Sequence, residues 1–246
     1  MTRQVLIATV IALGFVACGG GNPGPKPLSH HFDESDIALV AMDKKQAMLT
    51  AQQEFHEAKA KFQQAQAHLS EVTTDLKVAK NKQGQARLGA KSAKQEKKQA
   101  DSSNDMTRVN AAARELRAAE LDKRAADERV SYLKARKKYL KRWVRYTKEE
   151  MYNKEAKYEL AKARVAQANN ISPKGFKFDK FKSQSQKRSE RAQKAKVNAD
   201  KDKSKAEAKQ KKYEATEKEA TRARGGSTAS GAGDGDDGGG GDPGQN

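Results

Sequence analysis

The feature that most constrains the fold is a seven-residue repeat of apolar side chains. In the first half of the chain, one position of the repeat is large and the position three residues later is small. The large positions are Met48, Phe55, Phe62, Leu69 and Leu76, and the small ones are Ala51, Ala58, Ala65, Val72 and Ala79. A strict repeat over five heptads is typical of a left-handed coiled coil. We therefore expect a coiled-coil helix over residues 36–100.

A second, weaker repeat runs through residues 106–170. Lysines interrupt it, but their methylene stems can lie along a seam while the charge reaches water. Its strongest apolar positions are Val130, Leu133, Leu140, Val144 and Met151. The polar residues 101–105 separate two arms of nearly equal length, which predicts an antiparallel helical hairpin. One continuous helix that pairs with another chain is the alternative.

The end of the second arm is marked by Pro173 and Gly175, which terminate helices, so we expect a break over residues 171–178. An alanine- and lysine-rich helix is expected over residues 179–224. Residues 174–224 carry 18 Lys and Arg against 8 Asp and Glu. The predicted fold class is therefore all-α: a long coiled-coil hairpin plus a third, basic helix.

An aromatic stripe lies on one face of the second arm, away from the apolar repeat. Its members are Tyr132, Tyr139, Trp143 and Tyr146, at helical spacing. If the chain folds back near Ser172, Tyr132 lies opposite Tyr213. This favours a third helix packed over the stripe. The alternative is a strip that contacts glycans or lipids, because Tyr and Trp suit boundaries between water and apolar material.

The first 21 residues have the order of a secretory signal. Arg3 is followed by an apolar run over residues 5–16, and Ala17 and Cys18 precede three glycines. A charged start, an apolar core and a small-residue cleavage site define such a signal. The apolar run is shorter than the ~20 residues that span a bilayer. We expect residues 1–17 to be a signal peptide cleaved between Ala17 and Cys18.

The residues Phe15-Val16-Ala17-Cys18 resemble the lipobox of bacterial lipoproteins, with Phe15 in place of the usual leucine. The resemblance covers residues 1–18. It implies a diacylglycerol on the Cys18 sulfur and an acyl chain on its new amino group, and hence a membrane partner through this lipid anchor. The alternative is an ordinary signal with a chance cysteine. In enteric lipoproteins, an aspartate directly after the lipidated cysteine marks retention at the inner membrane. Residue 19 is glycine instead, so the resemblance favours the periplasmic face of the outer membrane.

Both ends of the mature chain have low-complexity composition. Residues 18–35 are rich in glycine and proline, so we expect the lipidated cysteine to be followed by a flexible tether. Residues 225–246 contain glycines and aspartates but no lysine, arginine or large apolar residue. They are expected to form a disordered tail.

No catalytic motif is present, and the sequence predicts neither an enzyme nor a metal site. The histidines His30, His31, His56 and His68 do not have the spacing of a ligand set. No cofactor is expected apart from the lipid on Cys18.

The formal net charge of +18 would suit nucleic acid in a cytoplasmic chain. Because the signal implies export, we expect no nucleic acid. We expect anionic envelope components instead: peptidoglycan, lipopolysaccharide or acidic polysaccharide. The coiled coil could also bind a second copy of this chain or another protein, and the sequence leaves both alternatives open.

The hypothesis is a lipid-anchored structural or scaffold lipoprotein of the cell envelope. The alternative is a periplasmic chaperone-like protein that binds clients with basic helical arms, similar to the Skp-type holdases.

Overall fold

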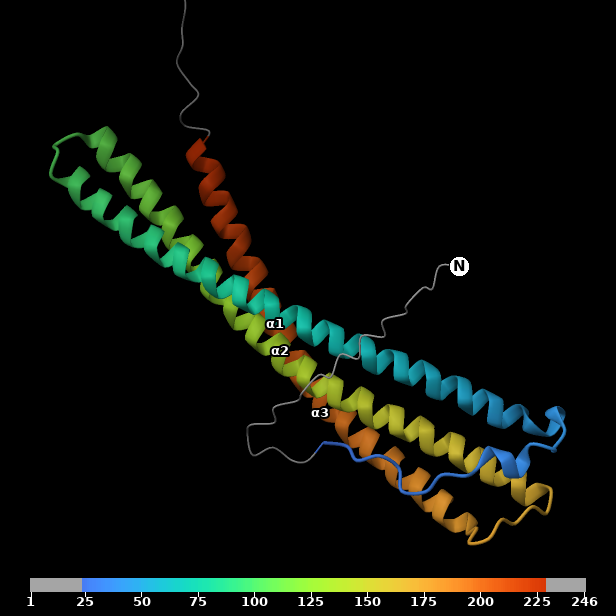
Figure 1. The fold of residues 1–246 in the computed structure, drawn as a ribbon. Helices are drawn as coiled ribbons and strands as arrows, with labels where there is room; N and C mark the ends of the chain where they lie inside the picture. The colour runs from blue at the N-terminus through green and yellow to red at the C-terminus, as the bar shows by residue number, and fades with distance from the viewer. Residues whose placement is uncertain (1–23, 229–246) are drawn as a thin grey trace, which may run out of the picture.

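The computed structural model describes residues 24–228, and three long helices dominate it. Helix α1 spans Gln46–Asp101, α2 spans Met106–Ala168 and α3 spans Phe178–Thr228 (Figure 1). Two short 3₁₀ helices, η1 (Glu34–Ile37) and η2 (Met42–Lys45), precede α1. No strand occurs within residues 24–228. The all-α prediction is confirmed.

A tight turn reverses the chain between α1 and α2. Asn104 takes a left-handed backbone conformation with φ 55°, which asparagine tolerates better than most residues. The Asp105 carboxylate then caps α2 and accepts the N–H groups of Thr107 and Arg108 at 2.9 and 3.2 Å. These donors have no partner within the helix, so the cap stabilises its start. The two arms are therefore an antiparallel hairpin within one chain.

The second reversal lies at residues 169–177. Asn170 and Gly175 have φ of 56° and 82°, and the Ile171 N–H donates to the carbonyl of Ala166 at 2.9 Å. This bond closes the end of α2. Helix α3 then runs antiparallel to α2, so that Arg188 of α3 lies beside Glu149 and Arg224 lies beside Asp122.

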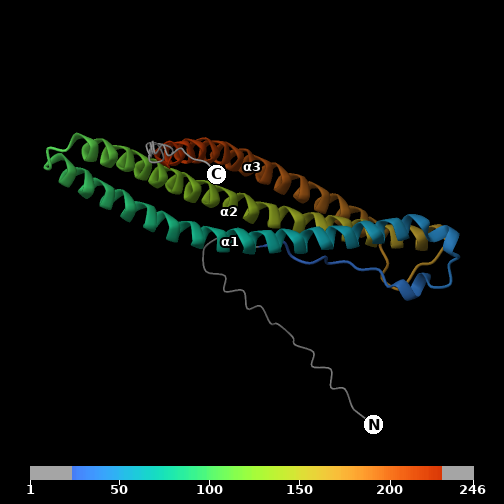
Figure 2. The ribbon, with the colours of Figure 1, turned by 90° about the horizontal axis from the view of Figure 1, so that it is seen from above.

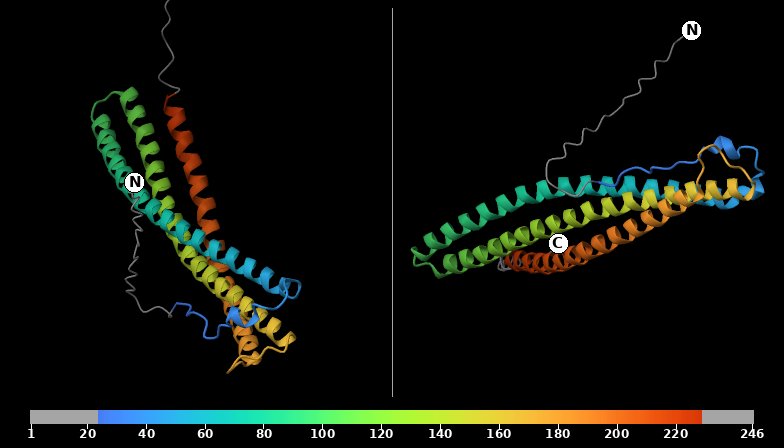
Figure 3. Two further views of the ribbon diagram at one scale, coloured as in Figure 1. Left: turned by 45° about the vertical axis from the view of Figure 1, so that its right-hand side comes forward. Right: turned by 90° about the horizontal axis from the view of Figure 1, so that it is seen from below.

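The middle helix of the rod is α2. Helices α1 and α3 each pack along it, one on either side, as Figure 2 and the right panel of Figure 3 show. At about 1.5 Å per residue, the 63 residues of α2 make the rod about 95 Å long.

The seam between α1 and α2 follows the predicted repeat, with one refinement. The small positions Ala58, Ala65, Val72 and Ala79 are buried in the seam. Small side chains let the two helix backbones approach closely. The large side chains of Phe55, Phe62 and Leu69 flank the seam and are only half-buried. The buried positions of the repeat in α1 are Met48, Ala58, Ala65, Val72, Leu76 and Ala79. On α2, Val130, Leu133 and Leu140 are buried, whereas Val144 and Met151 are half-buried.

Helix α3 packs on α2 by alanine at seven-residue intervals. Ala192, Ala199 and Ala206 are buried, as is Ala220 two heptads further on. Tyr213 occupies the heptad position between Ala206 and Ala220 and is half-buried. Lysines cover the remaining faces, so the helix stays basic toward solvent.

Two clusters of apolar side chains divide the core. The first lies at the end of the rod where α1 begins and α2 ends, and it includes Phe32, Met48, Tyr158 and Phe181. The second lies near the middle of the hairpin and joins Val72 and Leu76 of α1 to three residues of α2: Val130, Leu133 and Leu140. We call the end with the first cluster the base and the end with the α1–α2 turn the tip.

Two predicted boundaries are corrected by the structure. Residues 36–45, expected to be helical in continuity with α1, contain instead the end of η1, a turn and η2, because the chain reverses direction at the base before α1 starts. The Lys45 ammonium donates to the Ala38 carbonyl at 2.9 Å and closes this reversal. At the other end, α3 continues through residues 225–228, which were expected to begin the tail. Residues 1–23 and 229–246 lie outside the described part of the chain.

Candidate functional site

The segment over residues 24–45 is part of the folded rod, and we call it the docked segment. It runs along α2 and α3 from the middle of the rod to the base, shown in blue in Figure 1. Leu28, Phe32 and Ile37 are buried. The Phe32 ring meets Phe176 and Phe181 with centroids 5.6 and 6.2 Å apart. For residues 24–35 this overturns the prediction of a flexible tether.

Side chains of α3 hold the backbone of the docked segment near its start. The Gln184 side-chain oxygen accepts the N–H groups of Ser29 and His30 at 3.1 and 3.0 Å, and its amide nitrogen donates to the His30 carbonyl at 2.8 Å. Arg188 donates from Nη2 to the carbonyls of Lys26 and Pro27 at 2.7 and 2.9 Å. These side chains therefore satisfy backbone N–H and carbonyl groups of the segment, which has no regular secondary structure there to do so.

Side chains of α2 hold it further along. Glu159 Oε2 accepts the Phe32 N–H at 2.6 Å, and the Lys162 ammonium donates to the Phe32 carbonyl at 2.9 Å. Glu159 and Lys162 also pair with each other at 2.8 Å, and both are buried. The Tyr158 hydroxyl donates to Glu34 at 2.5 Å. The pKa of Tyr158 is raised mainly by burial and, as the second cause, by this hydrogen bond to Glu34.

Arg188 is the residue where the docked segment, α2 and α3 meet. Its guanidinium lies 3.6 Å from the Glu149 carboxylate, and both side chains are only 8% exposed. It also lies over the Tyr152 ring, 5.1 Å from the centroid. Burial of a charged pair is tolerated only where further polar contacts satisfy it. The carbonyls of Lys26 and Pro27 satisfy Nη2, whereas Nη1 and Glu149 Oε2 are buried without a hydrogen-bond partner among residues 24–228. Docking of the segment therefore supplies part of the polar surroundings that the buried Arg188 needs.

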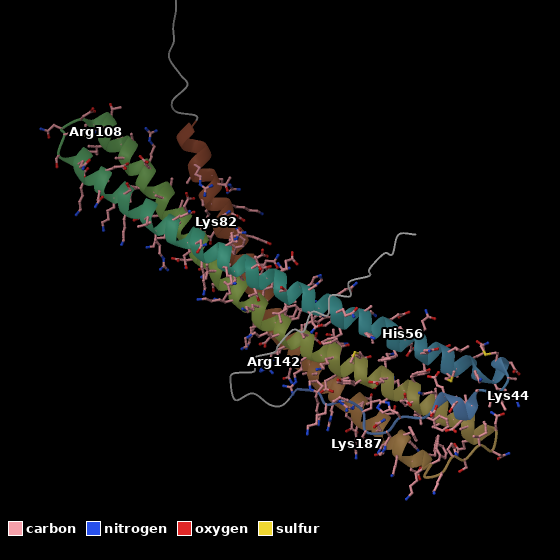
Figure 4. The ribbon with its side chains drawn as sticks, viewed as in Figure 1. Lys44, His56, Lys82, Arg108, Arg142 and Lys187 are labelled. Carbon is pink, nitrogen blue, oxygen red and sulfur yellow. The ribbon has the colours of Figure 1, made fainter. Side chains whose placement is uncertain are left out.

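A cleft of about 550 Å³ lies where the docked segment begins. Residues 24–26 form one wall, α2 contributes Arg142, Arg145 and Glu149, and α3 contributes Arg191 and Lys194. We call it the basic cleft, defined by Lys26, Arg142, Arg145, Arg191 and Lys194. Its one acid, Glu149, faces Arg188. Figure 4 labels Arg142 near the middle of the rod, close to the start of the described chain.

The cations of the basic cleft have little internal compensation. Arg142 makes a long contact of 3.7 Å with Asp202, which also faces Lys138 at 3.7 Å. Within residues 24–228, the side chains of Lys26, Arg145, Arg191 and Lys194 form no ion pair. Elsewhere α3 is tied to α2 by pairs such as Arg224–Asp122 and Lys212–Glu128. Positive charge in the cleft therefore exceeds the charge of the nearby carboxylates, Glu149 and Asp202.

The aromatic stripe lies at the interface of α2 with α3. The Tyr132 and Tyr213 rings stack with centroids 6.1 Å apart and planes 5° apart. Tyr139, Trp143 and Tyr146 continue the ring contacts along α2. Burial, then the charges of Asp200 and Glu207 on α3, raises the pKa of Tyr139. The stripe is half-buried, and it packs partly against the apolar cluster of the hairpin.

The remaining predicted site residues are placed as follows. The cleavage site at Ala17 and the lipidation site Cys18 lie outside the described residues. His56 and His68 are exposed on α1, and His31 lies 3.7 Å from Glu159. In residues 24–228 no group of three His, Cys, Asp or Glu side chains is arranged to hold a metal ion. None of the helices described in the structure is long and apolar enough to cross a membrane.

Sequence reasoning missed the side chains that hold the docked segment, namely Glu159, Lys162, Gln184 and Arg188, and it missed Glu149, which faces Arg188. A charged or amide residue on a helix rich in such residues carries no signal of its own. The signal that was present is Leu28, Phe32 and Ile37, which are large apolar residues inside a segment otherwise typical of a spacer.

Comparison of the chain with protein-family models, with curated proteins and with solved structures found no match. The function of this chain therefore has to be inferred from its own residues and geometry.

Proposed function

We propose that this chain is a lipid-anchored structural protein of the bacterial cell envelope, in which Cys18 carries the lipid and the three-helix rod is a scaffold. The observation that carries the proposal is the docking of residues 24–45. Residues 24–45, which begin six residues after Cys18, are bound to the rod by Gln184, Arg188, Glu159 and Lys162, so these contacts would carry a load applied at the anchor to the helices.

The docked segment also determines where the anchor attaches. Gly24 shares a cleft with Arg142, which lies just past the midpoint of α2. Cys18 is six residues before Gly24, and an extended chain reaches about 3.5 Å per residue. The lipid is then within about 20 Å of the middle of the rod. Such a protein is attached to the membrane near the middle of the rod, with the base and the tip extending from that point in opposite directions.

The rod itself suits a scaffold. Alanine seams make long, uniform contacts, and charged pairs such as Lys154–Glu54, 2.8 Å apart, link neighbouring helices. The basic surface of α3 suits contact with the anionic components of an envelope.

Cell fractionation tests this proposal. We expect the wild-type chain to stay with membranes through washes with high salt and to be released by detergent, because acyl chains hold it. The Cys18→Ala variant should appear in the soluble fraction. If both chains fractionate alike, Cys18 does not anchor the protein. If the Cys18→Ala rod co-purifies with unfolded outer-membrane proteins, the chaperone alternative is favoured.

A further inference from the structure

The basic cleft has an arrangement that the scaffold role alone does not require. Five cations from three separate parts of the chain surround one hollow: Lys26, Arg142, Arg145, Arg191 and Lys194. Like charges this close repel one another. Elsewhere in the rod the helices place carboxylates against such cations, as Asp127 does against Arg87 at 2.8 Å.

The described part of the chain begins at this same place. Gly24, Pro25 and Lys26 form the wall of the cleft, and only five residues separate Gly24 from Cys18. If Cys18 enters a bilayer, the headgroups around its acyl chains are within about 20 Å of the rim of this cleft. An anion from the bilayer would supply the charge that the cleft lacks.

We propose that the basic cleft binds the phosphate of an anionic phospholipid headgroup in the bilayer that takes the acyl chains of Cys18. This deepens the proposed function and depends on it, because the anchor is what brings the bilayer to the cleft. Guanidinium groups suit this ligand, since they donate paired hydrogen bonds to phosphate oxygens. A hollow of about 550 Å³ accommodates a headgroup and leaves the acyl chains in the membrane.

Bound phospholipid would also orient the rod. A tether alone leaves the rod free to rotate about its attachment point. A second contact on the same side turns the face that carries the docked segment toward the membrane.

The test is vesicle sedimentation of the full chain carrying Cys18→Ser, so that no acyl chain contributes. Vesicles of phosphatidylcholine with about 30% phosphatidylglycerol are compared with pure phosphatidylcholine. The site variant is Arg145→Gln, Arg191→Gln and Lys194→Gln together. The matched control is Lys80→Gln, Lys91→Gln and Lys94→Gln on α1, where all three side chains are exposed and the change in net charge is the same. Circular dichroism checks that both variants remain folded.

We expect binding to anionic vesicles and little binding to phosphatidylcholine. The site variant should lose at least about tenfold in vesicle affinity and the control less than about threefold. Equal losses in both variants would overturn the proposal, because diffuse surface charge would then explain the binding. So would a site variant that binds anionic vesicles like the parent. The parent could also fail to bind vesicles but bind purified peptidoglycan, with that binding lost in the site variant. This result would overturn the proposal and assign the cleft to the cell wall.

This outcome is separate from that of the fractionation experiment. The vesicle test uses a chain without the lipid, so the cleft can fail while the anchor stands. The anchor can also fail while vesicle binding persists.

Discussion

The Arg188 guanidinium lies 3.6 Å from the Glu149 carboxylate at the contact of α3 with α2, and its Nη2 also donates to the carbonyls of Lys26 and Pro27. One side chain thus joins two helices and the docked segment. This buried charged contact lies in a fold whose helix seams are mostly alanine.

Replacing Arg188 by methionine removes that junction. We expect Arg188→Met to lower the free energy of unfolding by about 3 kcal/mol, because Glu149 is left buried without its partner. The double variant with Glu149→Gln should recover part of the loss. Urea unfolding followed by circular dichroism measures both. Lys187→Met, the exposed neighbour, is the control and should change stability by less than about 0.5 kcal/mol. Similar losses at both positions would contradict the assigned role.

Phe32 is the apolar anchor of the docked segment. Truncation to alanine leaves a cavity between Phe176 and Phe181, and we expect a loss of about 3 kcal/mol. Hydrogen exchange should show lost protection in the docked segment, while the cluster around Val130 and Leu133 stays protected. Leu39→Ala, at a fully exposed side chain, is the control. Unchanged exchange in Phe32→Ala would show that residues 24–35 are not held as described.

Tyr213 makes the contact of α3 with α2 sensitive to alkaline pH. Burial, followed by the hydrogen bond to Glu217, raises the pKa of Tyr213 to about 12, against about 10 in an unfolded chain. Its contribution to stability is therefore complete below about pH 10 and is lost as pH rises toward about 12. Tyr213→Phe keeps the ring stacked on Tyr132 but cannot ionise. Alkaline unfolding of this variant should begin at higher pH than that of wild type, and unfolding at the same pH would contradict the shift.

Gly84 and Gly89 weaken the interior of α1. A Cβ added at either position meets no atom within 4 Å. Because glycine is about 1 kcal/mol less favourable than alanine inside a helix, Gly84→Ala and Gly89→Ala should each raise stability by about that amount. Gly175, whose φ is 82°, should respond in the opposite direction, since alanine is strained there. Thermal unfolding of the three variants checks the signs, and destabilisation by Gly84→Ala would contradict this account of α1.

Much of the fold follows from periodicity. The repeat through Val72 and Leu76 predicted α1, and the polar break before Asp105 predicted the hairpin. Folding the chain back near Ser172 predicted the register that stacks Tyr132 on Tyr213. These elements are predictable because a coiled-coil seam repeats, so each heptad supports the assignment of the next.

The docked segment had no such support. Glycine and proline around Pro25 and Pro27 favour a spacer when composition alone is considered. Its partners, Gln184 and Arg188, recognise backbone groups, and backbone recognition leaves no pattern in the sequence of the segment. The basic cleft was unpredictable for the same reason, since it combines Lys26 with residues more than 100 positions later in the chain.

Intact-mass spectrometry of the membrane-extracted protein tests the central claim most directly. We predict a wild-type chain that begins at Cys18 and carries the added mass of a diacylglycerol and an N-acyl chain, and a Cys18→Ala chain with no lipid. A wild-type mass equal to that of the unmodified polypeptide would contradict the lipid-anchored scaffold.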